Sequence, residues 1–193
     1  MKAIRAFIAF DLPDDVLEII GEIQKQLKKK GLKLRWVPVC NIHLTVKFIG
    51  DLPADLIDQV AGIMTESAER CSLMTINASG MGVFPGLRRP SVLWIGIHGE
   101  TDRLIRFQKT LDENLERIGI QSEKRPFRGH LTIGRVKTNP NMELLKESLR
   151  LFNDFQTRPF TIKEVKLFQS ELTPAGAVYS CIKSIALSGP TEK

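Results

Sequence analysis

The chain has 193 residues, of which 42% are hydrophobic and 26% are charged, a balance typical of one globular domain. No apolar run is long enough for a transmembrane helix. The N-terminal apolar run is interrupted by Arg5 and ends in acidic residues, so it predicts a strand rather than a signal peptide. The formal net charge of +6 permits a polyanionic partner such as nucleic acid, although charge alone does not identify one.

The three cysteines, Cys40, Cys71 and Cys181, are odd in number and far apart. This pattern argues against a disulfide framework and against a cysteine-rich zinc site. A reducing cytoplasm is therefore the expected compartment.

The hydrophobic pattern predicts an α+β order of elements. In the first helix, apolar residues recur on one face from Val16 to Leu27, and Gly31 follows its end. The run Lys28–Lys30 is expected to be the solvated end of that helix, and RNA binding by this run is the less favoured interpretation. In chain order, the expected elements are a strand at 4–10, a helix at 13–30, strands at 32–37 and 43–49, a helix at 53–70, strands at 72–83 and 91–97, a helix at 101–118, a strand at 129–136, a helix at 140–152, and strands at 159–170 and 177–187.

Two of the three histidines lie in matching tetrapeptides, HLTV at 43–46 and HLTI at 130–133. Each tetrapeptide falls on an expected strand, and the two are separated by nearly half the chain. The duplication predicts a single bilobal domain over residues 1–193. We expect two similar lobes with antiparallel sheets, helices outside, a pseudo-twofold axis and a central cleft to which each lobe contributes one motif strand.

Side chains alternate between the two faces of a strand. Strict alternation places His43, Thr45 and Lys47 on the cleft face and assigns Phe48 to the core, although an aromatic side chain there could also stack on a terminal base.

The second motif presents His130 and Thr132 in the same way. Arg135 would point away from His130 unless Gly134 permits a bulge or the strand ends there.

Two imidazoles in one cleft suit general acid–base catalysis near neutral pH. Threonine hydroxyls beside them can donate hydrogen bonds to phosphoryl oxygens, so this set of groups favours phosphodiester cleavage without a metal. A purely structural role for the pair and a metal site are the alternatives. The metal site is disfavoured because threonine is a poor ligand and no HxH or HxxxH spacing occurs. His98 lacks the motif and is assigned no role.

Basic residues near the motifs are candidates for binding the substrate. Arg88 and Arg89 lie in a loop bounded by proline and glycine, where either ligand contacts or simple solvation is expected. The full set of basic candidates is Lys47, Arg88, Arg89, Arg128 and Arg135.

The paired HxTx motifs resemble those of the two-histidine phosphoesterases. Within that superfamily, the chain is similar to the RNA 2′,3′-cyclic phosphodiesterase branch, once called 2′-5′ RNA ligases. The similarity extends over nearly the whole chain, through RAFIAFDLP at 5–13, LRWVPVCNIHLTVKFIGDL at 34–52, GVFPGLRRPSVLWIGI at 82–97, PFRGHLTIGR at 126–135 and FQSELTPAGAVYS at 168–180.

The resemblance implies hydrolysis of a terminal 2′,3′-cyclic phosphate to a 2′-phosphomonoester. His43 would donate a proton to the leaving 3′ oxygen, and His130 would accept one from water. The implied partner is RNA with a cyclic phosphate end, including tRNA fragments, and the protein is expected to be a monomer without metal or other cofactor. Gly129 replaces a residue common in relatives, and no consequence is assigned to it.

Two alternatives stay open at this point. The same site could run in reverse and join RNA ends through a 2′-5′ linkage. The protein could also be a non-catalytic module that binds RNA ends, although such a module would not require two matched histidines.

Overall fold

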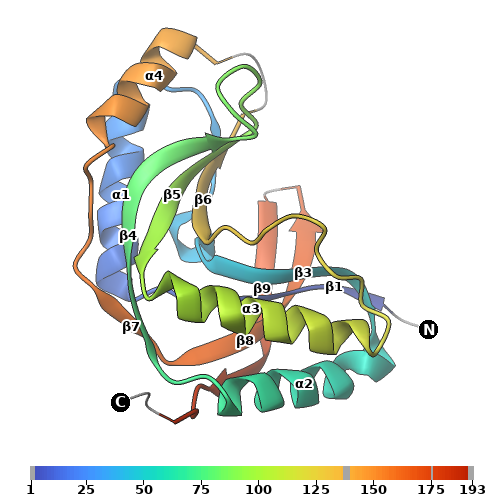
Figure 1. Cartoon of the computed structure of the whole chain (residues 1–193). Helices are drawn as coiled ribbons and strands as arrows, with labels where there is room; N and C mark the ends of the chain where they lie inside the picture. The colour runs from blue at the N-terminus through green and yellow to red at the C-terminus, as the bar shows by residue number, and fades with distance from the viewer. Residues whose placement is uncertain (1–2, 137–139, 175, 191–193) are drawn as a thin grey trace.

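The computed structural model describes residues 3–136, 140–174 and 176–190. Within these ranges the chain is an α+β protein, as predicted, with antiparallel strand pairing (Figure 1). The helices are α1 (Asp14–Lys29), α2 (Ile57–Glu69), α3 (Thr101–Glu116) and α4 (Met142–Leu151), with short 3₁₀ turns η1 (Val39–Asn41) and η2 (Ala54–Leu56). The strands are β1 (Ala3–Phe10), β2 (Arg35–Trp36), β3 (Leu44–Pro53), β4 (Met74–Phe84), β5 (Val92–Gly99), β6 (His130–Arg135), β7 (Phe160–Ile162), β8 (Glu164–Thr173) and β9 (Gly176–Ala186).

The strands of the described ranges form one sheet in the order β7-β4-β5-β6-β3-β1-β8-β9, with β2 added beside β6. Its two halves meet between β3 and β6, where Leu44 pairs with Leu131. Both leucines are fully buried, and each is the second residue of an HLT motif. The two lobes expected from the sequence therefore share a continuous sheet, and the motif strands are neighbours at its centre.

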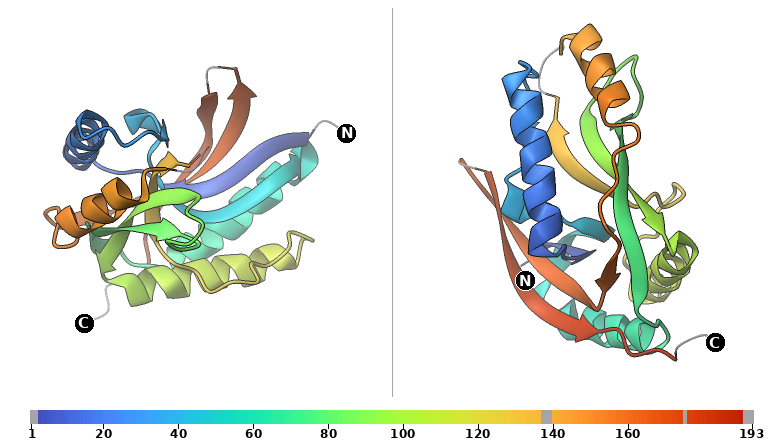
Figure 2. Two further views of the ribbon diagram at one scale, coloured as in Figure 1. Left: turned by 90° about the horizontal axis from the view of Figure 1, so that it is seen from above. Right: turned by 90° about the vertical axis from the view of Figure 1, so that its left-hand side faces the viewer.

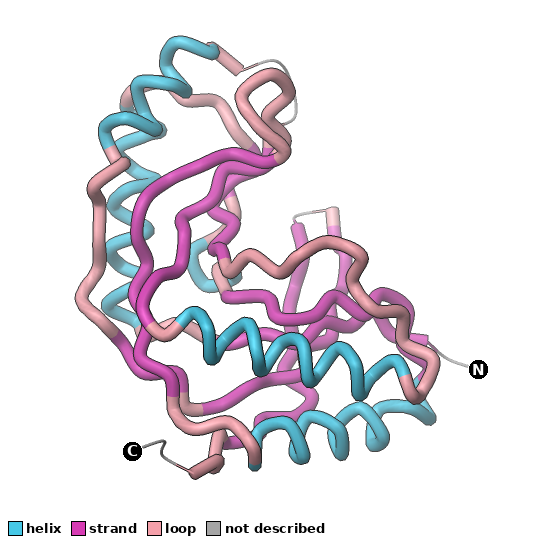
Figure 3. Tube along the Cα trace, viewed as in Figure 1, coloured by secondary structure: helices cyan, strands magenta, loops and turns pink. Residues whose placement is uncertain are grey.

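The sheet curls strongly because two consecutive strands near the C-terminal end of the chain pair with different partners. The expected single strand at 159–170 is two strands, since β7 pairs with β4 and β8 pairs with β1. Only Lys163 separates them, although β7 is at one end of the strand order and β8 is next to the other end. The two ends of the sheet must therefore approach each other, as the tube in Figure 3 shows.

The helices cover the outside of this curled sheet. Helices α1 and α4 lie beside one half and α2 and α3 beside the other (Figures 1 and 2). The apolar face predicted for the first helix is confirmed, because Val16, Ile20, Ile23 and Leu27 are buried. No helix in the described part of the chain is both long and apolar enough to cross a membrane.

Candidate active site

Both motif strands carry a β-bulge at the fourth residue of the motif. In β3, Thr45 pairs with Ala9 and Lys47 pairs with Ile8, so Val46 has no partner in β1. In β6, Thr132 pairs with Trp94 and Gly134 with Leu93, so Ile133 has no partner in β5. Since a bulge inserts one unpaired residue, the alternation of side chains is reversed beyond it in both strands.

The reversal determines which side chains reach the site. Phe48 and Arg135, each five residues after its motif histidine, both line the pocket that contains His43. Arg135 thus reaches the pocket under the conditions that were named for it, because β6 ends at Arg135 and has a bulge, although the unpaired residue is Ile133 and not Gly134. The prediction that Phe48 belongs to the core is wrong, because its side chain is 47% exposed and the Arg5 guanidinium lies 5.0 Å from its ring centroid.

The same bulge also overturns the prediction that Lys47 lies on the cleft face. Lys47 is 2% exposed, and its ammonium donates hydrogen bonds to the Asp112 carboxylate of α3 and to the Gln121 carbonyl oxygen. The other Asp112 oxygen accepts a hydrogen bond of 2.9 Å from the Glu123 N–H. Lys47 is therefore a buried cation that holds the segment containing Gln121 and Glu123 against the sheet through Asp112, and it is not placed to bind substrate.

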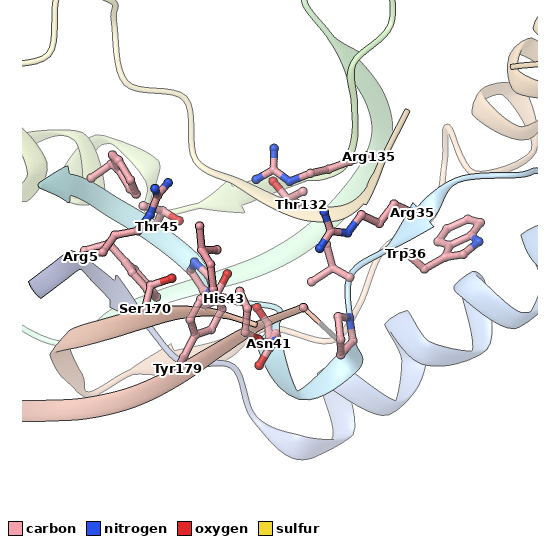
Figure 4. A pocket seen from close by; sticks show the side chains of 17 residues that line it. Arg5, Arg35, Trp36, Asn41, His43, Thr45, Thr132, Arg135, Ser170 and Tyr179 are labelled. Carbon is pink, nitrogen blue, oxygen red and sulfur yellow. Dashed lines mark hydrogen bonds between the residues drawn. The ribbon is translucent and has the colours of Figure 1, made fainter. Parts of the chain in front are cut away.

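The pocket has a volume of about 500 Å³ and lies over the centre of the sheet (Figure 4). His43, Thr45, Thr132 and Arg135 line it, whereas His130, the other predicted histidine, is not among its lining residues. Sequence reasoning missed the polar and aromatic lining residues that come from other strands and from η1. These are Arg5, Phe7, Arg35, Trp36, Asn41, Ser170 and Tyr179.

The main chain fixes the orientation of both motif imidazoles in the same way. His43 Nδ1 lies 2.8 Å from the Asn41 carbonyl oxygen, and His130 Nδ1 lies 2.7 Å from the Arg128 carbonyl oxygen. A carbonyl oxygen only accepts hydrogen bonds, so each neutral ring carries its proton on Nδ1. Each Nε2 is then the nitrogen that can exchange a proton with a substrate.

Aromatic rings surround the two histidines to different extents. Phe7 stacks on His43 with centroids 4.7 Å apart, and Tyr179 meets the same ring edge-on at 5.4 Å. His130 has one such contact, with Phe84 edge-on at 5.0 Å. The two sites are related by their motifs, but His43 is the more enclosed of the two.

Burial lowers the pKa of His43 below its usual value of 6.5. The positive charges of His130 and Arg135 act in the same direction, whereas the hydrogen bond to Asn41 and the charge of Asp11 oppose the shift. In the free protein, neutral His43 is thus favoured at neutral pH.

Asn41 also connects His43 to the β8–β9 hairpin. Its side-chain Nδ2 donates a hydrogen bond of 2.7 Å to the Ala177 carbonyl oxygen, while its own carbonyl oxygen holds His43. The hairpin supplies Ser170, Leu172 and Tyr179 to the pocket wall. One residue therefore positions both an imidazole and the wall facing it.

The other basic candidates lie outside this pocket. Arg88 and Arg89 are exposed in the loop between β4 and β5. Arg128 borders a second hollow that also includes His98, and neither of them lines the pocket that contains His43. Only the backbone of Arg128 serves the site, through the bond to His130. Within the described residues, no three His, Cys, Asp or Glu side chains gather closely enough to hold a metal ion.

Comparison with known proteins decides the family. Residues 12–173 match the model of the 2′-5′ RNA ligase superfamily. The chain belongs to this superfamily. It is an enzyme of the phosphoesterase type, as its paired motifs predicted.

An RNA 2′,3′-cyclic phosphodiesterase of Methanocaldococcus jannaschii is 35% identical over 179 residues, which cover 93% of this chain and 98% of the relative. An RNA 2′,3′-cyclic phosphodiesterase of Thermotoga maritima is 31% identical over 186 residues, which cover 96% of this chain and 96% of the relative.

Two solved structures share the fold. The protein TT0787 of Thermus thermophilus aligns with a TM-score of 0.81 at 23% identity, over 97% of this chain and 100% of that one. E. coli LigT complexed with 3′-AMP aligns with a TM-score of 0.77 at 24% identity, over 97% and 99% of the two chains. At these identities the alignments establish the common α+β architecture.

Proposed function

We propose that the protein hydrolyses the terminal 2′,3′-cyclic phosphate of RNA to a 2′-phosphomonoester by acid–base catalysis with two histidines. The observation that carries this proposal is the matched pair of imidazoles at the start of two HLT motifs whose leucines pair in adjacent strands, because each Nδ1 is held by a main-chain carbonyl and Nε2 is then the nitrogen that can exchange a proton. The names of the relatives support the same substrate. We further propose that the protein acts as a monomer in the cytoplasm, on RNA ends that include tRNA fragments, without a metal or other cofactor.

The proposed reaction uses each histidine once. Neutral His130 accepts a proton at Nε2 from a water molecule as the water oxygen attacks phosphorus. Protonated His43 donates its Nε2 proton to the 3′ oxygen as the P–O3′ bond breaks. One water is consumed, and a later proton exchange with solvent restores both rings.

The remaining pocket groups would stabilise the charge that develops on the phosphate. The hydroxyls of Thr45 and Thr132 donate hydrogen bonds to the non-bridging oxygens, and the Arg135 guanidinium offsets their negative charge. At one end of the pocket, the exposed ring of Phe48 offers a stacking surface for the terminal base.

The decisive assay is incubation with an oligoribonucleotide that ends in a 2′,3′-cyclic phosphate, in the presence of EDTA. The expected product carries a 2′-phosphate and forms at the same rate with and without the chelator. Activity that EDTA abolishes and one divalent ion restores would contradict metal-independent catalysis. A 3′-phosphate product would contradict the proposed direction of ring opening.

The same assay separates the two alternatives. Addition of an RNA with a free 5′-hydroxyl tests for the reverse reaction, because joined strands with a 2′-5′ linkage would then accumulate. The superfamily name makes this reaction the second candidate. A module that only binds RNA ends would give no product in either direction.

The pH dependence tests whether two histidines act together in the reaction. Since burial lowers the pKa of His43, its protonated form decreases as pH rises through a value below 6.5. Catalysis needs one ring protonated and the other neutral, so kcat/KM should show a bell that belongs to the coupled pair, and the lowered pKa of His43 places the midpoint of its acidic limb below 6.5. A profile with a single limb would contradict a mechanism that uses two titrating rings.

A further inference from the structure

We propose that the nucleotides preceding the cyclic end bind along a basic and aromatic surface, the Trp36 track, formed by Arg35, Trp36, Lys28, Lys29 and Lys33. The ligand class is single-stranded RNA, with phosphates at the cationic groups and a base at the indole. This inference rests on the proposed function, since it assigns the path of the strand whose end is hydrolysed.

The track begins with two arginines of like charge on neighbouring strands. Arg35 of β2 is directly opposite Arg135 of β6, and both exposed side chains line the pocket. Neither guanidinium forms an ion pair with an acidic residue in the described part of the chain. Like charges directly opposite each other in a sheet are destabilising, and a phosphate between them would relieve the repulsion.

Trp36 continues the surface from the pocket toward helix α1. Its half-buried ring lines the pocket, and the Lys28 ammonium lies 5.5 Å from the ring centroid. An indole beside a cation is the combination that proteins use to stack bases and hold the backbone of single-stranded RNA.

The lysines at the end of α1 extend the positive charge beyond Trp36. Lys28, Lys29 and Lys33 are exposed, and the only ion pair of the run joins Lys30 to Glu147 at 2.8 Å within the described residues. The helix dipole accounts for lysines in the last turn of α1. The prediction of a solvated helix end is confirmed, and the proposal adds a second role for this end because Lys28 lies over a tryptophan that lines the pocket.

The two ends of the pocket differ in charge, which gives the bound strand a direction. Figure 4 shows Arg5 and Thr45 on one side of His43 and Arg35 with Trp36 on the other. The Arg5 guanidinium already lies over the Phe48 ring, at the end suited to the terminal base. Arg5 lies at the Phe48 end, whereas Arg35 and the three lysines of the track lie at the Trp36 end, where the preceding phosphates would bind.

The test measures binding and hydrolysis separately. Fluorescence anisotropy of a labelled oligoribonucleotide ending in a 2′-phosphate gives affinity at several salt concentrations. The triple variant Lys28→Gln, Lys29→Gln, Lys33→Gln should bind at least about tenfold more weakly at low salt. The slope of log K against log salt should fall by about 2, because each contact with a single-strand phosphate contributes about 0.7.

A matched control removes the same charge elsewhere. The variant Lys109→Gln, Lys124→Gln, Lys163→Gln replaces three exposed lysines that do not line the pocket. It should leave the affinity and the salt slope unchanged. Trp36→Leu should weaken oligonucleotide binding about tenfold, since base stacking on an aromatic side chain contributes at this level.

Hydrolysis of a nucleoside 2′,3′-cyclic phosphate by the unaltered protein tests the proposed function independently of the track. If the protein hydrolyses this substrate but the track triple variant keeps the full salt slope, the track is wrong. An equal loss in the two lysine triple variants would also overturn it, because the effect would then be one of net charge. A loss of slope in Arg88→Gln/Arg89→Gln, with none in the track variant, would instead place the strand over the β4–β5 loop.

Discussion

Replacement of either motif histidine by alanine should lower kcat/KM for a 2′,3′-cyclic phosphate by about 10²–10⁴-fold, because each ring supplies a separate proton transfer in the proposed mechanism. His43→Ala and His130→Ala should each give this loss with an unchanged circular dichroism spectrum. The double variant should be little worse than the poorer single variant, since groups that act as a unit are not additive.

His98→Ala is the control for this experiment. His98 lies on the second hollow, outside the pocket that the motifs share, so its removal should leave the rate close to that of the unaltered protein. A motif variant that retains activity within a few-fold would refute the two-histidine mechanism.

Lys47→Met should lower the free energy of unfolding by about 3–5 kcal/mol, because it leaves the buried Asp112 carboxylate without its cation. The side chains of the pair are only 1% and 11% exposed. Urea denaturation followed by circular dichroism measures the effect. The double variant Lys47→Met/Asp112→Leu should recover part of the loss, since the buried charge is gone but the Gln121 carbonyl and the Glu123 N–H lose their partners.

A surface pair provides the comparison. On α3, Lys109 Nζ lies 3.8 Å from Glu113 Oε1, and the two side chains are 73% and 61% exposed. Lys109→Met should change the free energy of unfolding far less, because solvent screens an exposed pair. Equal effects at the two lysines would show that burial of the Lys47 pair does not govern stability.

The sequence allowed much of the fold to be predicted, because it depends on local patterns. Helical periodicity and end signals located the helices. Of the four residues predicted from the duplicated HLT motif, His43, Thr45 and Thr132 line the pocket and His130 does not. The errors at Lys47 and Phe48 share one cause. Strict alternation assumes a regular strand, and nothing in the residues of the motif marks the bulge at Val46.

The residues that were missed are placed in the pocket by long-range pairing. Arg35 reaches it because β2 pairs with β6, and Tyr179 because the β8–β9 hairpin folds back beside β1. Asn41 is close to His43 in sequence, but its bond to Ala177 depends on that hairpin. Such contacts follow from strand order and register, which periodicity along a single chain does not specify.

The pairing of Leu44 with Leu131 has a consequence for the timing of catalysis. Neighbouring strands in a sheet are about 4.8 Å apart, and their spacing is set by the hydrogen-bond ladder. In the proposed mechanism, the separation of the two proton-transfer groups is therefore set by a fully buried strand pair and does not require two domains to close around the substrate, as it does in hinged enzymes. The proposed acid and base would then be held on neighbouring strands before substrate binds, and adjustment on binding would be left to the side chains and the hairpin around them.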